Sequence, residues 1–151
     1  MNGLPVLRAR SAYSWLTGPC PPERMVGALG VEGPRPRPVA LCDRDGVWGL
    51  VEFLRAAQAQ GSGVRPIPGV EVTDPRGGGS AWMLVRSETG WRRLCSLVTR
   101  RHLDERFDLA RAVARRQEGC LVLVEDPRTL PAWSAYVEPG RLRAAVDPLR
   151  A

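Results

Sequence analysis

Short runs of hydrophobic residues alternate along the chain with longer segments in which hydrophobic residues recur every three or four positions. The short runs predict β-strands, and the periodic segments predict amphipathic helices, because a helix turns once in 3.6 residues. Strands are expected at residues 4–9, 39–43, 64–72, 81–86, 119–126 and 140–148. Helices are expected at residues 21–29, 47–61, 87–103 and 107–119, with Ser87 as the N-cap of the third.

Prolines and glycines separate these segments. Residues 30–38 contain three prolines and two glycines, which excludes regular structure there, and residues 74–80 are expected to form a turn. Pro66 and Pro68 predict an irregular strand. The alternation of strands and helices predicts an α/β fold with a mostly parallel sheet, and the length predicts a single domain over residues 1–151.

The chain is basic, with 22 lysine plus arginine residues against 16 acidic residues and a net charge of +6. Every basic residue is arginine, which a GC-rich genome explains as well as function does. A basic chain still favours anionic partners such as nucleic acid. No hydrophobic run approaches the ~20 residues that span a bilayer, and the first residues lack the features of a signal peptide. We therefore expect a cytoplasmic location without a membrane partner.

The cysteines do not suggest a metal site. Cys20, Cys42, Cys95 and Cys120 are scattered, without a C-x-x-C pair, and His102 is the only histidine. Such cysteines are most simply reduced, small apolar residues. We expect no bound cofactor.

Charged residues lie at the carboxyl ends of three of the expected strands. Arg8 and Arg10 lie at the end of the first, Asp43 and Arg44 at the end of the second, and Glu71 at the end of the third. Functional groups of parallel α/β folds gather at the carboxyl ends of strands. Two residues two apart in a strand point to the same face, so Arg8 and Arg10 would direct two positive charges to one place. The cluster could bind an anion, or its charges could satisfy one another.

Four ordered blocks resemble a known family. They are "LRARSAYSWLTG" at residues 7–18, "ALCDRDGVWGLVEF" at 40–53, "IPGVEV" at 67–72 and "ETGWRRLCSLVTRRHL" at 88–103. They are similar to the polymerase and histidinol phosphatase (PHP) domain of bacterial C-family DNA polymerases, namely the DNA polymerase III alpha subunit and error-prone DNA polymerases. The family's first block typically reads L-H-x-H-S-x-Y-S-x-L-D-G and its second A-L-T-D-H-G. The resemblance is best supported over residues 4–126.

The resemblance implies a seven-stranded β/α barrel whose metal ions activate water to hydrolyse phosphoesters. The positions that match the family's metal site in this chain are Arg8, Arg10, Thr17, Asp43, Arg44 and Glu71. Arg8 and Arg10 stand at the H-x-H pair, Thr17 at the aspartate of L-D-G, and Arg44 at the histidine of T-D-H. The family's domain is longer than this chain, so the barrel is expected to be incomplete, with an open sheet edge through which the chain could self-associate.

Arginine cannot replace a histidine ligand, because a guanidinium has no lone pair to donate and stays charged. At ~4 Å and an effective dielectric constant near 20, each contact between unit charges is worth about 4 kcal/mol. Arg8, Arg10 and Arg44 would therefore repel a metal ion. We expect neither a metal ion nor catalytic residues, and the chain is not expected to be an enzyme on its own.

The leading functional hypothesis is a non-catalytic PHP-like domain with a scaffold or interaction role in DNA replication or translesion repair. Its partners would be other DNA polymerase or mutagenesis-complex subunits. Two alternatives stay open. One is a metal-dependent phosphoesterase or 3′–5′ exonuclease that acts on DNA. The other is an anion-binding module that holds phosphate with Arg8, Arg10 and Arg44. DNA binding through the arginines of residues 87–103 is a weaker hypothesis.

Overall fold

The computed structural model describes residues 4–14, 18–31, 34–59, 63–77 and 79–144. The chain divides into two compact units, residues 1–70 and 71–151. The division falls inside the third strand, so each unit is described by itself. No helix in the described ranges combines the length and the apolar character that a membrane span needs.

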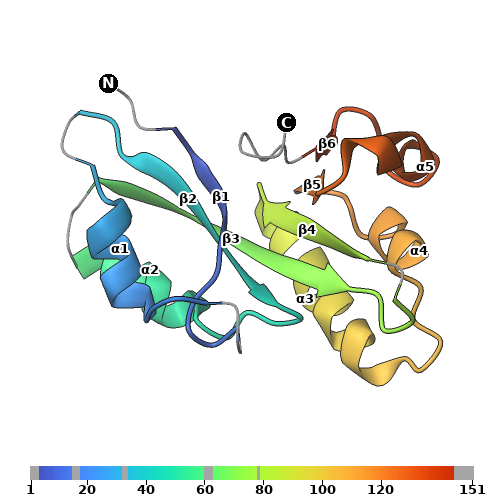
Figure 1. Cartoon of the computed structure of the whole chain (residues 1–151), viewed down its shortest axis with the longest axis horizontal. Coiled ribbons are helices and arrows are strands. Elements are labelled where there is room, and N and C mark those ends of the chain that lie inside the picture. Colours follow the sequence, from blue (N-terminus) through green and yellow to red (C-terminus); the bar gives the residue numbers. More distant parts are fainter. Residues whose placement is uncertain (1–3, 15–17, 32–33, 60–62, 78, 145–151) are drawn as a thin grey trace. The chain divides into compact units, whose positions relative to one another are not determined.

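The first unit begins with two parallel strands that are linked by a helix (Figure 1). Its elements are β1 (Val6–Ala9), α1 (Pro22–Leu29), β2 (Arg37–Arg44), α2 (Leu50–Ala59) and most of β3 (Val64–Thr73). The register between β1 and β2 shifts between Val6 and Ala9. The helices α1 and α2 contact each other and lie on the same side of the strands.

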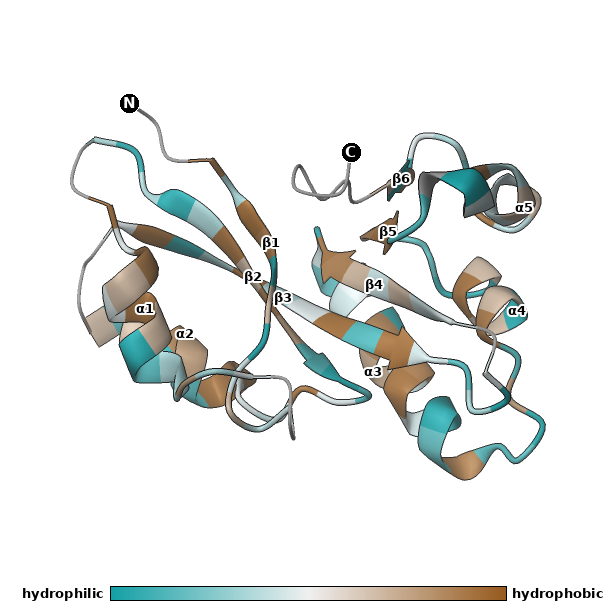
Figure 2. Cartoon of the chain, viewed as in Figure 1, coloured by the Kyte–Doolittle hydropathy of each residue, from teal (hydrophilic) through white to brown (hydrophobic). Residues whose placement is uncertain are grey.

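The core of the first unit follows the hydrophobic pattern. Residues 39–42 of β2 are at most 1% exposed, and Val26 of α1 and Phe53 of α2 are fully buried. Figure 2 shows these apolar stretches next to the hydrophilic residues of the exposed helix faces. Burial of such side chains removes apolar area from water and fixes both helices on the sheet.

The second unit combines three further strands with helices. Its elements are β4 (Ser80–Val85), α3 (Glu88–Leu103), α4 (Leu109–Ala114), β5 (Cys120–Val124), the 3₁₀-helix η1 (Pro127–Thr129), α5 (Leu130–Ser134) and β6 (Leu142–Ala144). β4 pairs with β5 antiparallel, and β5 pairs with β6 parallel. The strands follow one another in the sheet in chain order.

The expected alternation of strands and helices is confirmed, and so is the N-cap, because Ser87 Oγ accepts the backbone N–H of Gly90 at 3.2 Å. The β4–β5 pair is the antiparallel part of a sheet that was expected to be mostly parallel. The expectation of no regular structure over residues 30–38 was wrong at its end, because β2 already begins at Arg37. α5 was not expected, because five residues are too few to show helical periodicity.

α4 is shorter than the expected helix at residues 107–119. Its end is fixed by the side-chain amide of Gln117, which donates to the carbonyls of Ala114 at 3.0 Å and Tyr136 at 2.9 Å. The side-chain oxygen of Gln117 accepts the backbone N–H of Glu138 at 2.8 Å. One buried amide thus ends the helix and attaches the segment after α5 to it.

Two glycines allow α3 and β5 to touch. A Cβ atom on Gly90 would lie 2.0 Å from the carbonyl oxygen of Gly119, far inside van der Waals contact. Gly119 has a φ of +72°, in the left-handed region that favours glycine. Its carbonyl also accepts the backbone N–H of Arg86 at 2.8 Å. The first turn of α3 therefore lies directly against the start of β5.

We predict that Gly90→Ala destabilises the protein by roughly 1–3 kcal/mol, because the new methyl group must displace backbone rather than a flexible side chain. Gly27→Ala in α1 is the control, since a Cβ there meets no atom within 4 Å. This control should be neutral or stabilising by up to about 1 kcal/mol, because alanine favours helix over glycine. Denaturant unfolding measures both changes. Equal free energies of unfolding for the two variants would contradict the close contact.

Cys120 generates a second prediction. All four cysteines are described, and none forms a disulfide. The side chain of Cys120 is 1% exposed, and its thiol donates to the carbonyl of Gly90 at 3.4 Å. Burial raises the pKa of this thiol from 9.0 to about 11, and the charge of Arg141 offsets part of the rise.

As pH rises past 9, the unfolded thiol loses its proton while the folded thiol keeps it until about pH 11. The folded state then binds more protons, so the free energy of unfolding should fall between pH 9 and 11. Cys120→Ala should show a shallower fall, because only the thiol is removed while the other titrating groups remain. Denaturant unfolding of both proteins across this range tests the prediction, and parallel pH profiles would disprove it.

Candidate functional site

The carboxylate of Asp43, at the end of β2, is 1% exposed and is surrounded by hydrogen-bond donors. The backbone N–H of Ser11 donates to it at 2.8 Å, and that of Gly49 at 2.9 Å. The hydroxyl of Ser11 lies 2.9 and 2.8 Å from its two oxygens, and the hydroxyl of Ser14 lies 2.7 Å from Oδ1. Four donor groups therefore compensate one buried negative charge, as burial of a charge requires.

The two serine hydroxyls are themselves held in place. Ser11 Oγ accepts the backbone N–H of Tyr13 at 3.2 Å, and Ser14 Oγ accepts that of Arg44 at 3.0 Å. Each hydroxyl therefore accepts one backbone N–H and donates to Asp43. The resulting network connects the loop at residues 11–14 to the end of β2 and, through Gly49, to the start of α2.

The network leaves no room for side chains at two glycines. A Cβ atom on Gly49 would lie 2.6 Å from Ser11 Oγ and 3.0 Å from Asp43 Oδ2. One on Gly18 would lie 1.6 Å from the carbonyl oxygen of Ser11. The backbone at Gly49 therefore lies directly against the buried carboxylate, and the backbone at Gly18 lies against the peptide group of Ser11.

A more exposed contact also links the loop to α2. The Tyr13 hydroxyl donates to the carboxylate of Glu52, with distances of 2.9 and 2.8 Å to its two oxygens. The hydrogen bond to Glu52, more than the slight desolvation, raises the pKa of Tyr13 above its usual value. The Tyr13–Glu52 hydrogen bond and the Asp43 network together position the loop at residues 11–14, which is part of the first motif.

The expected site residues occupy different environments. Arg8, in β1, and Arg10, directly after it, are half-buried, whereas Arg44 at the end of β2 is exposed. Glu71 lies on β3 in the second unit and is 1% exposed. Thr17 lies outside the described residues. Arg44 and Asp43 are joined through Ser14, whose hydroxyl donates to the carboxylate and accepts the backbone N–H of Arg44.

The hydrogen bonds of Asp43 bear on whether its carboxylate could also hold a metal ion. Four donor groups share its two oxygens, with the Ser11 hydroxyl lying between Oδ1 and Oδ2, and four is the number of lone pairs that a carboxylate offers. The neighbouring Arg44 has a guanidinium, which cannot act as a ligand. Within the described residues, no group of three or more histidine, cysteine or acidic side chains is placed to hold a metal.

Sequence reasoning identified Asp43 but not its donors. We considered an ion pair with arginine, whereas the hydrogen bonds to its carboxylate come from serine hydroxyls and backbone amides. The only available signal was the pair of serines after the first strand, Ser11 and Ser14. Nothing in their spacing points to a carboxylate 29 to 32 residues further along the chain.

The family model for the PHP domain matches residues 7–135, and the chain therefore belongs to the PHP domain family. Its relatives include error-prone DNA polymerases. It is 34% identical over 106 residues to that of Anaeromyxobacter dehalogenans (strain 2CP-C) and 33% identical to that of Anaeromyxobacter sp. (strain K). Each match covers 66% of this chain and 9% of the polymerase. The chain thus spans a small part of these relatives' length, and the resemblance found in the motifs is confirmed.

Among solved structures, the chain is similar to a protein of Bifidobacterium adolescentis described as a metal-dependent phosphoesterase. The TM-score is 0.42 and the identity 16%, over 94% of this chain and 46% of that one. The family match confirms the expected fold class, a mixed α/β fold that corresponds to an incomplete PHP-type β/α barrel.

The Asp43 network leads to a prediction about stability. Asp43→Asn should lower the free energy of unfolding by about 2–4 kcal/mol, because the new amide group meets donors where the carboxylate offered acceptors. Asp126→Asn makes the same chemical change at a carboxylate that pairs with the exposed Arg128 and should have no measurable effect. Denaturant unfolding compares the two variants. A loss at Asp43 no larger than at Asp126 would show that the network does not support the fold.

Proposed function

We propose that this chain is a non-catalytic PHP domain with a scaffold or interaction role in DNA replication or translesion synthesis. The main support is the saturated carboxylate of Asp43. Its acceptor capacity is taken by Ser11, Ser14 and Gly49, which leaves none for the metal that phosphoester hydrolysis in this family would need.

The residue types at the family's ligand positions support the same proposal. Arg8, Arg10 and Arg44 replace histidines, and Thr17 replaces an aspartate. The positive charges of these three arginines disfavour the binding of a cation within a few ångströms of them. Asp43 and Glu71 are the carboxylates that remain at these positions. In this proposal the remnant of a metal site consists of Arg8, Arg10, Thr17, Asp43, Arg44 and Glu71.

The proposed partners follow from the relatives. The similar proteins are error-prone DNA polymerases. A domain of this family without its own chemistry would contribute by contacting other polymerase or mutagenesis-complex subunits in the cytoplasm. We propose that residues 1–151 act there as one partial PHP domain.

Metal analysis tests the proposal most directly. The full chain, produced with zinc, manganese and iron supplied, should contain no stoichiometric metal by mass spectrometry. It should also release no nucleotides from the 3′ end of DNA when these metals are added. An active PHP phosphoesterase treated in parallel is the control for metal loading and for the assay.

Stoichiometric metal together with metal-dependent DNA hydrolysis would overturn the proposal in favour of the enzyme. Affinity capture with the tagged full chain tests the interaction role. The role predicts recovery of polymerase or mutagenesis-complex subunits, and recovery of none of them would contradict it.

A further inference from the structure

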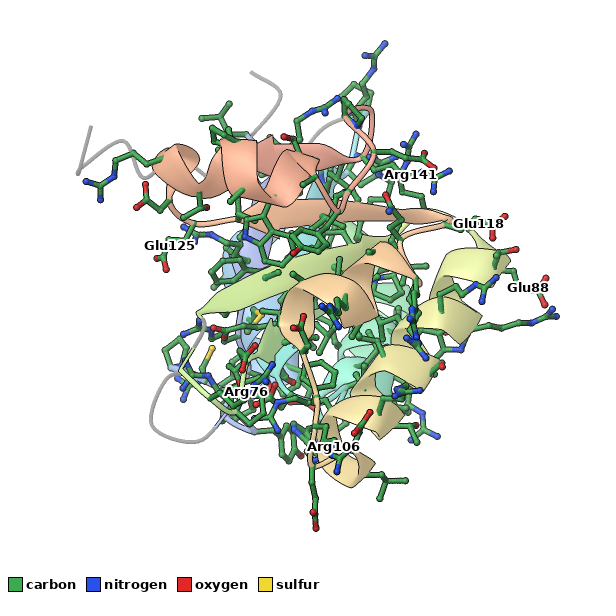
Figure 3. The ribbon with its side chains drawn as sticks, turned by 90° about the vertical axis from the view of Figure 1, so that its right-hand side faces the viewer. Arg76, Glu88, Arg106, Glu118, Glu125 and Arg141 are labelled. Carbon is green, nitrogen blue, oxygen red and sulfur yellow. The ribbon has the colours of Figure 1, made fainter. Side chains whose placement is uncertain are left out.

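A small cavity lies in the second unit where α3 ends and α4 begins. Its volume is about 170 Å³. The arginines that line it are Arg100, Arg106, Arg111, Arg115 and Arg116. In Figure 3, Arg106 lies at the end of α3 that is away from Glu88. We call this cavity the α3–α4 cavity. None of its lining residues is among the six positions that match the family's metal site.

The lining carries more positive than negative charge. Five arginines face two aspartates, Asp104 and Asp108, which leaves an excess of three positive charges. Asp104 already pairs with Arg100 and accepts the backbone N–H of Arg106 at 3.0 Å. Asp108 caps α4 and also lies 3.5 Å from Arg76, which is outside the lining. The two carboxylates therefore cannot neutralise the remaining guanidiniums.

Arg116 shows the electrostatic consequence. Its guanidinium donates to Ser96 Oγ at 3.0 Å and to the carbonyl of Ala112 at 3.3 Å, so neutral groups hold it in position. Burial lowers the pKa of Arg116, and the positive charges of Arg100, Arg115 and Arg93 lower it further. An anion in the cavity would offset this repulsion.

Contacts that do not involve the five lining arginines hold the wall of the cavity in place. Arg101 donates to the carbonyl of Thr73 at 2.6 Å and to its hydroxyl at 2.9 Å, and its guanidinium lies 6.0 Å from the ring centre of Phe107. The backbone N–H of Leu109 donates to Asp74 at 3.3 Å. A site that is formed before its ligand arrives loses less entropy on binding.

We propose that the α3–α4 cavity binds a phosphate group. Its volume is below the ~300 Å³ at which pockets begin to hold drug-sized ligands, so it suits a single oxyanion rather than a whole nucleotide. Guanidinium groups match phosphate oxygens with paired, charge-assisted hydrogen bonds. The phosphate can be free in solution or part of the backbone of single-stranded DNA. This inference does not depend on the proposed non-catalytic function.

Titration of the full chain with inorganic phosphate at constant ionic strength, followed by NMR, tests the inference. Arg115→Gln and Arg116→Gln should each weaken phosphate binding roughly tenfold, the effect of losing one hydrogen bond to a charged group. Arg115 is exposed, so that variant keeps the test valid even if Arg116→Gln fails to fold.

Arg92→Gln is the matched control. It removes the same charge from α3, the helix whose last turn contributes Arg100 to the lining, and Arg92 is 74% exposed, outside the lining. It precedes Arg100 by about 12 Å of helix, which exceeds the ~8 Å Debye length at physiological salt. Phosphate affinity should therefore be unchanged. No binding in the millimolar range, or equal losses for Arg92→Gln and Arg115→Gln, would overturn the inference.

A second arm separates the two sources of phosphate. A short single-stranded oligonucleotide without terminal phosphate replaces inorganic phosphate as the probe. If Arg115→Gln weakens its binding and Arg92→Gln does not, the cavity accepts a backbone phosphodiester. If inorganic phosphate alone shows this pattern, the cavity accepts a free anion. Either result supports the inference, whereas oligonucleotide binding that both variants weaken equally, without phosphate binding, contradicts it.

Discussion

The structure of the first unit depends on how one buried negative charge is compensated. The carboxylate of Asp43 receives donors from a loop, from the start of a helix and from the hydroxyls of Ser11 and Ser14. These segments must come together, or the charge is buried at a large cost. The same hydrogen bonds occupy the lone pairs that a cation would use. Local stability and metal binding would therefore compete for the same oxygen atoms.

Much of the fold could be predicted from the sequence because its signals are local. The hydrophobic periodicity gave the positions of the main helices and strands, and Ser87 was recognised as a cap from its place before α3. The features that escaped prediction depend on distant contacts. Gln117 ends α4 by binding the carbonyl of Tyr136, and the direction of β4 against β5 is set by pairing between strands 35 or more residues apart.

The candidate site shows the same division. That Arg8 and Arg10 cannot bind a metal follows from the chemistry of one side chain and needs no coordinates. The hydrogen bonds that surround the Asp43 carboxylate could not be inferred from the sequence, because the path of the loop after β1 decides which donors reach it. The residues of the motif that match the family's usual pattern, Ser11 and Ser14, are those that hold this loop. Their contacts attach the loop directly to the carboxylate of Asp43.

The form of β1 has a consequence for aggregation. An exposed strand at the end of a sheet is a template on which further chains can add. β1, the first strand in the sheet order, has only four residues, follows Pro5, and is out of regular register with β2. Short length, a preceding proline and a bulge each reduce the row of unpaired backbone groups that an added strand needs. These features disfavour the addition of a further strand at β1, so self-association through a sheet edge would be more favourable elsewhere.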